Sequence, residues 1–101
     1  MEMTYQAKNR ELTIFLTGEL DHHAARNAME SIDQWIDQTF PTKTILDFSA
    51  LTFMDSSGIA LVIRAKRRME LLGGSLAVIN LPRQAERVLQ TAGLGRYMDL
   101  T

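Results

Sequence analysis

The spacing between apolar residues changes along this chain, and the change constrains the fold more than any other feature. Leu12, Ile14 and Leu16 recur at every second position, which is the period of a β-strand with one buried face. From Ala25 to Phe40 the apolar residues recur at steps of three or four, which is the period of an amphipathic helix. A sheet and a helix that cover each other are therefore expected, and the sequence predicts an α/β domain.

The first elements are predicted to be a hairpin and a long helix. Residues 4–8 and 11–17 are the expected strands, with a short turn at Asn9-Arg10 between them. The helix is expected to begin after Asp21, a good N-cap residue, and to stop before Pro41. Its inward stripe is predicted to comprise Ala25, Met29, Ile32, Ile36 and Phe40.

The rest of the chain alternates strand and helix. A short strand at 44–48 is followed by a loop and by a helix that stops at Gly73-Gly74. A continuous apolar strand at 76–79 is predicted to be buried on both faces, and Pro82 opens a third helix that ends at Gly93. A last short edge segment is expected at 97–98. The prediction is a small mixed sheet with an N-terminal hairpin, βα units and helices packed on the sheet.

The length and composition predict one globular unit. The chain has 101 residues, enough for one core, and lacks a linker or repeat, so we expect a single domain over 1–101. Its first residues have neither a basic flank nor an apolar stretch, and no apolar run approaches the roughly 20 residues of a membrane span. The expectation is a cytoplasmic protein without a membrane partner.

Charge and cysteine content narrow the function further. The formal net charge is −1, so there is no excess of basic residues to attract nucleic acid. The chain contains no cysteine, which excludes disulfides, thiolate metal sites and thiol catalysis. Arg64, Lys66, Arg67 and Arg68 form a basic cluster on the second predicted helix, but no aromatic residues alternate with them. A solvated helix face is favoured there over direct binding of nucleic acid.

Three predicted loops are expected to meet at one edge of the sheet. If the strands ending at Leu20, Phe48 and Asn80 are parallel, their carboxyl ends lie on the same side. That is the edge where open α/β sheets usually bind ligands and partners. The loops contain Asp21-His22-His23, Asp55-Ser56-Ser57-Gly58 and Asn80.

The run Asp55-Ser56-Ser57-Gly58 is the strongest candidate site. Aspartate and serine before a helix are capping residues first of all, but three such residues cannot all provide the same cap. The free N–H groups of the first helical turn and the positive end of the helix dipole favour a phosphate at this position. Gly58 is expected to leave room for another chain to approach.

The same residues also include types found in serine hydrolases and in metal sites. Ser57, a histidine and an aspartate supply the types of a Ser-His-Asp triad, but a G-x-S-x-G elbow and room for a cleft are missing. Adjacent His22 and His23 point apart, and Arg26 and Asn27 occupy the positions one turn later. We therefore predict neither an enzyme nor a metal or cofactor site. A small serine hydrolase remains the remote alternative.

Two stretches together resemble the STAS family, and within it the anti-sigma factor antagonists of the sporulation type. The stretches are Gly18-Glu19-Leu20-Asp21-His22-His23-Ala24-Ala25 and Phe53-Met54-Asp55-Ser56-Ser57-Gly58. The resemblance implies the STAS fold and a phosphoprotein that regulates transcription by switching partners. It also implies that the phosphoacceptor is the serine directly before the glycine, which is Ser57.

The resemblance further implies the partners. The unphosphorylated protein is expected to bind an anti-sigma factor serine kinase and so release a sigma factor, while phosphorylation of Ser57 by that kinase inactivates it. A phosphoserine phosphatase would restore the active form. The expected partner-binding surface comprises Asp21, His22, His23, Asp55, Ser56, Ser57, Gly58 and Ile59. The alternatives left open are a STAS module of another signalling complex and a ligand or nucleotide sensor.

Overall fold

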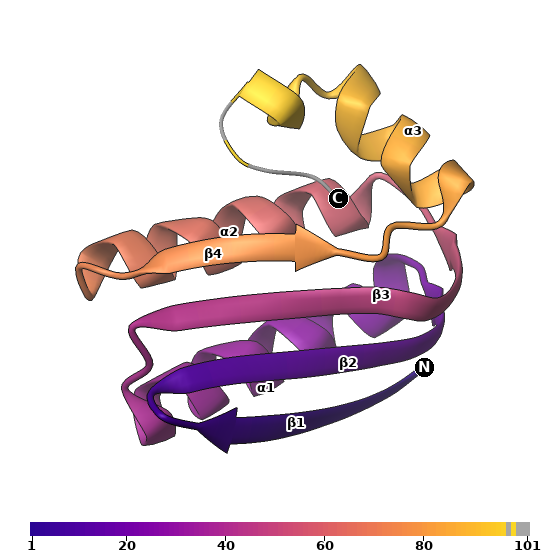
Figure 1. Ribbon diagram of the computed structural model, residues 1–101. Helices are drawn as coiled ribbons and strands as arrows, with labels where there is room; N and C mark the ends of the chain where they lie inside the picture. The colour runs from indigo at the N-terminus through magenta and orange to yellow at the C-terminus, as the bar shows by residue number, and fades with distance from the viewer. Residues whose placement is uncertain (97, 99–101) are drawn as a thin grey trace.

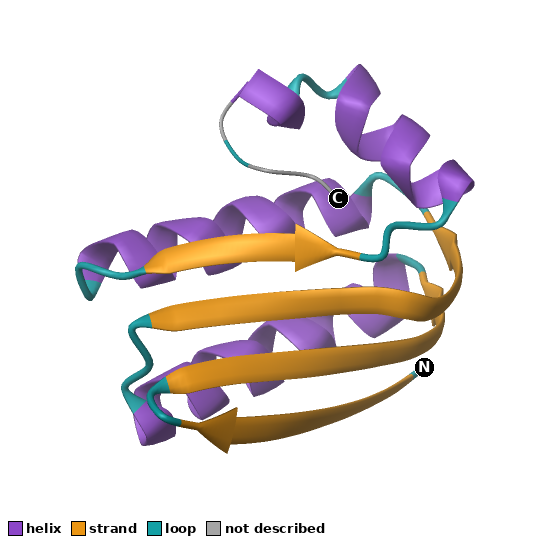
Figure 2. Ribbon diagram, in the orientation of Figure 1, coloured by secondary structure: helices purple, strands orange, loops and turns teal. Residues whose placement is uncertain are grey.

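The structure, a computed structural model, describes residues 1–96 and 98. Its elements follow the predicted order (Figures 1 and 2). They are β1 (Glu2–Lys8), β2 (Glu11–Leu20), α1 (His22–Thr39), β3 (Lys43–Met54), α2 (Ser57–Leu71), β4 (Ser75–Ile79), α3 (Arg83–Thr91) and a short 3₁₀-helix, η1 (Leu94–Arg96). The α/β prediction is confirmed.

The four strands form one mixed sheet in the order β1-β2-β3-β4. The hairpin partners β1 and β2 are antiparallel, and the pairs β2–β3 and β3–β4 are parallel. Helices α1 and α2 lie side by side against one face of the sheet, whereas α3 lies beyond the β4 side (Figure 1). No helix of the described residues covers the opposite face.

The core fills the space between the sheet and the two long helices. The even-numbered residues of β2 point into it, and Leu12, Ile14 and Leu16 are fully buried. On α1 the inward stripe contains Ala25, Ala28, Ile32 and Ile36. The alternation in β2 is thus confirmed. On α1 the spacing places Ala25, Ile32 and Ile36 as predicted, whereas the predicted Met29 is only partly buried and Ala28 is buried in its stead. None of the described helices is both long and apolar enough to cross a membrane.

The hairpin turn is built at Asn9 and Arg10, as predicted. Both residues have positive φ, 54° and 62°, which matches the two-residue turn that the twist of a hairpin favours. The Arg10 carbonyl accepts a bond from the Thr42 N–H at 2.8 Å, which ties the turn to the chain after α1. The Arg10 guanidinium also donates to the Phe40 carbonyl at 3.1 Å.

The end of α1 corrects one core prediction. Phe40 was expected on the inward stripe, but it is the C-cap and adopts a left-handed conformation with φ 46°. This conformation turns the chain out of the helix one residue before Pro41, and Phe40 is 61% exposed. Helical spacing therefore stops predicting burial at Thr39, where the helix ends.

Strand β3 is much longer than predicted. We expected a strand at 44–48 and then a loop, but the strand continues to Met54 beside β2. Two register shifts, between Phe15 and Thr17 and between Gly18 and Glu19, accommodate two extra residues of β3. Such bulges break the alternation of buried and exposed positions, which is why the sequence pattern beyond Phe48 resembles a loop.

Two further expectations about the second half of the chain need correction or lie outside the structure. Strand β4 was predicted to be buried on both faces, but only Leu76 and Val78 are buried, while Ala77 and Ile79 lie half-exposed on the uncovered face. The predicted edge segment at 97–98 includes Tyr97, which lies outside the described residues.

Candidate functional site

The starts of α1 and α2 meet at the carboxyl ends of β2 and β3. Leu20 pairs with Met54, the last residue of β3, and the Asp55 N–H donates to the Leu20 carbonyl at 3.2 Å. Because the strands end level with each other, Asp21 and Asp55 occupy equivalent positions on neighbouring strands. Two of the three predicted loops therefore do share one edge.

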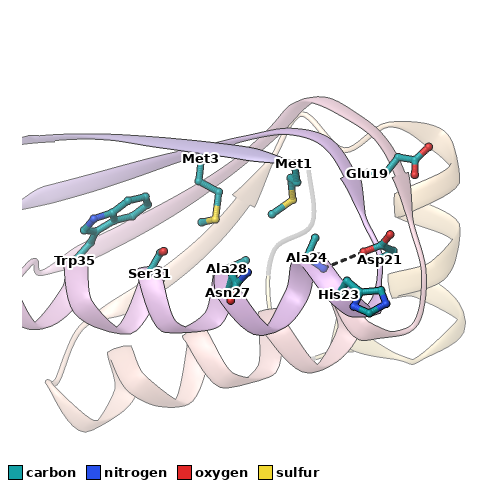
Figure 3. Close-up of a pocket in the computed structure, with 10 residues that line it drawn as sticks. All are labelled: Met1, Met3, Glu19, Asp21, His23, Ala24, Asn27, Ala28, Ser31 and Trp35. Atoms are coloured by element: carbon teal, nitrogen blue, oxygen red, sulfur yellow. Dashed lines mark hydrogen bonds between the residues drawn. The ribbon is translucent and has the colours of Figure 1, made fainter.

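Asp21 caps α1, as predicted. Its backbone is extended, and its Oδ1 accepts a hydrogen bond from the Ala24 N–H at 2.9 Å (dashed line in Figure 3). This bond, helped by the neighbouring His23, lowers the pKa of the Asp21 carboxyl below its ordinary value. His22 and His23 follow on the exposed first turn. The start of α1 thus exposes an ionised carboxylate and two histidines.

The start of α2 is capped by Asp55 and not by either serine. Ser56 occupies the N-cap position but its side chain makes no capping bond. Instead the Asp55 Oδ1 accepts from the Ser57 N–H at 2.8 Å, and the Asp55 carbonyl accepts from the Gly58 N–H at 3.0 Å. Within the described residues, the hydroxyls of Ser56 and Ser57 make no hydrogen bond to another protein group. Both are therefore available for chemistry.

Ser57 opens onto a groove between the N-terminal halves of α1 and α2. Its side chain is half-buried, whereas Ser56 is exposed. The groove is lined by His22, Ala25, Arg26, Met29, Glu30, Ser57, Ala60 and Arg64. The predicted serine and one of the predicted histidines thus lie on the same surface.

Gly58 is needed for packing inside the protein, which differs from the expected reason. The residue is buried, and a Cβ at this position would lie 2.4 Å from Cγ and 2.5 Å from Sδ of Met54. A larger residue here would force the Met54 side chain or the start of α2 to move. Ile59 is half-buried and packs on the core.

Gln84 of α3 is a contact that sequence reasoning missed. Its Oε1 accepts from the Met54 N–H at 2.9 Å, and its Nε2 donates to the Met54 carbonyl at 2.7 Å. Strand β4 cannot make these bonds, because its last residue, Ile79, pairs with Asp47. The Gln84 amide thus replaces a neighbouring strand at Met54. No local pattern in the sequence links these two residues.

Comparison with known proteins identifies the family. Residues 2–101 match the STAS domain. The chain belongs to the STAS family. The resemblance inferred from the two sequence motifs and the fold it implied are both confirmed.

The STAS relatives include proteins with a named regulatory role. An anti-sigma F factor antagonist of Lysinibacillus sphaericus is 35% identical over 99 residues, covering 97% of this chain and 85% of the relative. An anti-sigma F factor antagonist of Paenibacillus polymyxa is 30% identical over 89 residues, covering 88% of this chain and 76% of the relative.

Solved structures of STAS relatives share the fold closely. The unphosphorylated form of the anti-sigma factor antagonist SpoIIAA superposes with a TM-score of 0.85 at 35% identity, covering 99% of this chain and 88% of that one. The phosphorylated form of the Bacillus cell fate determinant SpoIIAA gives a TM-score of 0.76 at 34% identity, covering 99% of this chain and 91% of that one.

Asn80 lies elsewhere in this STAS domain, and its predicted place at the shared edge is wrong. Because β3 continues to Met54, the end of β4 lies beside the middle of β3, and the Asn80 amide donates to Asp47 Oδ1 at 3.3 Å. Partial burial raises the pKa of Asp47, but bonds from the Ser49 N–H and Asn80 outweigh it and keep the pKa below its ordinary value. Asp47 therefore holds Asn80, the residue that follows β4, against the middle of β3.

The residue types of a hydrolase are not assembled in the STAS domain. Across residues 1–96 and 98, no hydrogen bond joins Ser57 to His22 or His23, and the Asp55 side chain accepts from the backbone of Ser57. The same residues contain no group of three potential metal ligands.

The basic cluster on α2 is largely engaged in ion pairs. Arg64 pairs with Asp33 of α1 at 2.6 Å, and Arg68 pairs with Asp37 of the same helix. Lys66 lies 3.8 Å from Glu70. The face is solvated as expected, with Arg64 and Arg67 exposed, and Arg64 and Arg68 in addition join the two long helices of the STAS domain.

Proposed function

We propose that this STAS domain is an anti-sigma factor antagonist controlled by phosphorylation of Ser57. Unphosphorylated, it binds an anti-sigma factor kinase and so frees a sigma factor. The kinase then phosphorylates Ser57 and ends the complex, and a phosphoserine phosphatase restores binding. The protein acts in the cytoplasm as one domain over residues 1–101. It catalyses no reaction and contacts neither nucleic acid nor membrane directly.

One observation carries the proposal: the position of Ser57 in the first turn of α2. Asp55 already satisfies the Ser57 N–H, so the hydroxyl is left for the groove between α1 and α2. The relatives named as anti-sigma F factor antagonists, and SpoIIAA structures in both phosphorylation states, support the same role. By resemblance the phosphoacceptor is the serine before glycine, which favours Ser57 over Ser56.

The chemistry of this position suits a phosphate without a change of fold. The N–H groups of Ser57, Gly58 and Ile59 are already bonded to Asp55 and Ser56, so the first turn of α2 favours an anion through the positive end of the helix dipole and not through free N–H groups. A phosphate adds about −1.5 to −2 charges beside the carboxylates of Asp21 and Asp55. The proposed partner surface comprises Asp21, His22, His23, Asp55, Ser56, Ser57, Gly58 and Ile59. Because Gly58 is buried, its part in that surface is to let α2 begin close to Met54.

The added charge is large enough to work as a switch. At a distance of about 7 Å, a partner carboxylate would be repelled by roughly 1 to 5 kcal/mol at effective dielectric constants of about 20 to 80. That free energy corresponds to a loss of affinity of roughly fivefold to a few thousandfold. The repulsion acts directly at the interface.

The decisive experiment is phosphorylation by the cognate anti-sigma factor kinase with ATP, followed by site mapping with mass spectrometry. We expect one phosphate, on Ser57. The matched control is Ser56→Ala, which should still be phosphorylated, whereas Ser57→Ala should not. Phosphate on Ser56 or on a threonine would overturn the assignment.

Binding measurements on the same variants test the mechanism. Ser57→Ala should bind the kinase about as tightly as the wild type, and Ser57→Asp should bind more weakly because it adds a negative charge. Equal affinities of the phosphorylated and unphosphorylated proteins would contradict control by charge. Binding of a nucleotide by this chain without kinase binding would favour the sensor alternative.

A further inference from the structure

The two edges of the sheet are protected to different degrees. Strand β4 has five residues, and Pro82 and α3 follow it directly. Strand β1 has seven residues that pair with β2 without a register shift, and it contains no proline. No described segment lies beyond it (Figure 1). Natural proteins usually shorten, bend or cover such an edge, because its free N–H and C=O groups pair readily with another strand.

The hairpin register decides which residues of β1 face that open edge. In a hairpin with a two-residue turn, the pair next to the turn exchanges hydrogen bonds, and here that pair is Lys8 and Glu11. The direction of the backbone groups alternates along a strand. The N–H and C=O groups of Met3, Tyr5 and Ala7 therefore point away from β2.

We propose that the β1 edge binds the β1 edge of a second copy of this chain, antiparallel and about a twofold axis at Tyr5. In this register Tyr5 lies opposite Tyr5 of the second copy, and Met3 lies opposite Ala7. All three outward residues then exchange both of their backbone hydrogen bonds with the second copy. The two sheets join into one continuous sheet, which removes both open edges.

The charges of β1 are complementary to themselves in this arrangement only. Glu2 and Lys8 stand at opposite ends of the strand, and both side chains point to the face of the sheet that no described helix covers. Antiparallel pairing about Tyr5 places each Glu2 opposite Lys8 of the second copy. Parallel pairing would instead place like charges next to each other. The charge pattern thus selects both a second copy as the occupant and its direction.

The helix side of β1 offers surface for the second copy to cover. The Tyr5 ring lies against Trp35 of α1 with ring centroids 4.7 Å apart, yet Tyr5 remains 43% exposed. Beside it, Met1 and Met3 point from the strand toward α1 and line a groove that Trp35 closes at one end (Figure 3). The twofold axis brings the two Tyr5 rings together at the Trp35 end of this groove. Pairing thereby buries aromatic and methionine side chains.

The first test is the mass of the unphosphorylated full chain over a range of concentrations by analytical ultracentrifugation. We expect a reversible monomer–dimer equilibrium. Ala7→Pro removes an outward N–H without touching a bond to β2, and it should raise the dissociation constant about tenfold or more. The control is Ala60→Ser, an exposed position on α2 away from β1, which should leave the equilibrium unchanged.

Reversing the charge of Glu2 or of Lys8 tests the antiparallel register of the two β1 strands. Glu2→Lys and Lys8→Glu should each weaken self-association, because each places like charges opposite one another. A mixture of the two variants should associate about as well as the wild type, because opposite charges then meet at both contacts. Failure of the mixture to associate, when each variant is folded by circular dichroism, would overturn the antiparallel register.

A single introduced cysteine gives the position of the axis, since the chain has none of its own. Tyr5→Cys should form a disulfide-linked dimer readily, because paired Cα atoms about 5.5 Å apart suit a disulfide. Gln6→Cys, one residue further along, is the control and should link more slowly. A wild-type chain that stays monomeric at all concentrations, or equal linking by both cysteines, would overturn the proposal. None of these measurements depends on Ser57.

Discussion

Helices α1 and α2 begin at neighbouring points of the same sheet edge, and an aspartate caps each of them. In α1 the aspartate itself is the N-cap, and Asp21 accepts from the N–H of Ala24, three residues later. In α2 the aspartate stands one residue before the N-cap, and Asp55 accepts from the N–H of Ser57, two residues later. The arrangement at α2 gives the Ser57 N–H a hydrogen-bond acceptor and leaves the hydroxyls of Ser56 and Ser57 without a capping role.

This difference explains how a helix start can be stable and still be modified. A serine whose hydroxyl oxygen caps a helix has that oxygen esterified on phosphorylation, so its capping bond must be rearranged. At α2 the capping bond belongs to Asp55, so a phosphate on Ser57 removes no hydrogen bond of its side chain. Substitutions at the two helix starts test this contrast.

The largest effect is expected from Gly58→Ala, because α2 starts against Met54. The new Cβ would lie 2.4 Å from Met54 Cγ in a buried contact, so the side chain or the helix must move. We expect the free energy of unfolding to fall by about 1–3 kcal/mol, measured by urea denaturation. Ala24→Gly at the start of α1 is the comparison, where no such contact is involved.

A second substitution checks the cause of that loss. Met54→Ala removes the Cγ and Sδ atoms that the new Cβ would meet, so adding it to Gly58→Ala should cost less than the sum of the two single changes. Strict additivity would show that the two residues are not coupled, and an unchanged stability of Gly58→Ala would refute the packing explanation.

A smaller effect is expected from removing each cap. Asp21→Ala and Asp55→Ala should each lower the Tm by roughly 4–8 °C, because each leaves a first-turn N–H without its acceptor. Asp→Asn at the same positions keeps an acceptor oxygen and should lower the Tm less. If Asp55→Ala left the Tm unchanged while Asp21→Ala lowered it, the second start would not be capped as described.

The smallest effect is expected from pH. The pKa of Asp21 is lowered from 3.8 in the folded protein, mainly by the Ala24 N–H, so the ionised carboxylate stabilises the fold. This contribution is complete at pH values above 3.8 and is lost as the pH falls through the lower pKa of the folded protein. Tm measured from pH 6 downward should therefore decrease in acid. Asp21→Asn should show a shallower decrease, and an identical acid response would contradict the assignment.

The sequence predicts the elements whose residues repeat regularly and misses those where the repeat is interrupted. The alternation of Leu12, Ile14 and Leu16 and the helical spacing of Ala25, Ile32 and Ile36 place these side chains in the core. The bulges opposite β2 interrupt the alternation in β3. The second half of that strand therefore could not be recognised from its pattern, and with it the true position of Asn80.

In the candidate site too, sequence predicts the residues that follow a regular pattern and misses contacts between distant segments. The Asp21 cap follows from its place before a regular helix, and local sequence suffices to predict it. At α2 three polar residues compete for one cap, and only the backbone conformation of Ser56 selects Asp55. The contacts of Met54 with Gly58 and Gln84 depend on where distant segments meet, so no local spacing encodes them.

The bonds between Gln84 and Met54 have a consequence for the motions of the native protein. Both backbone groups of Met54 that face away from β2 are held by one side chain of α3. If α3 undocks for a moment, the last residue of β3 loses these partners just before Asp55 and Ser57. The slow exchange of amide hydrogens at Met54 and in α3 should then report the same opening event. The order of the backbone that leads into Ser57 is therefore tied to the docking of α3.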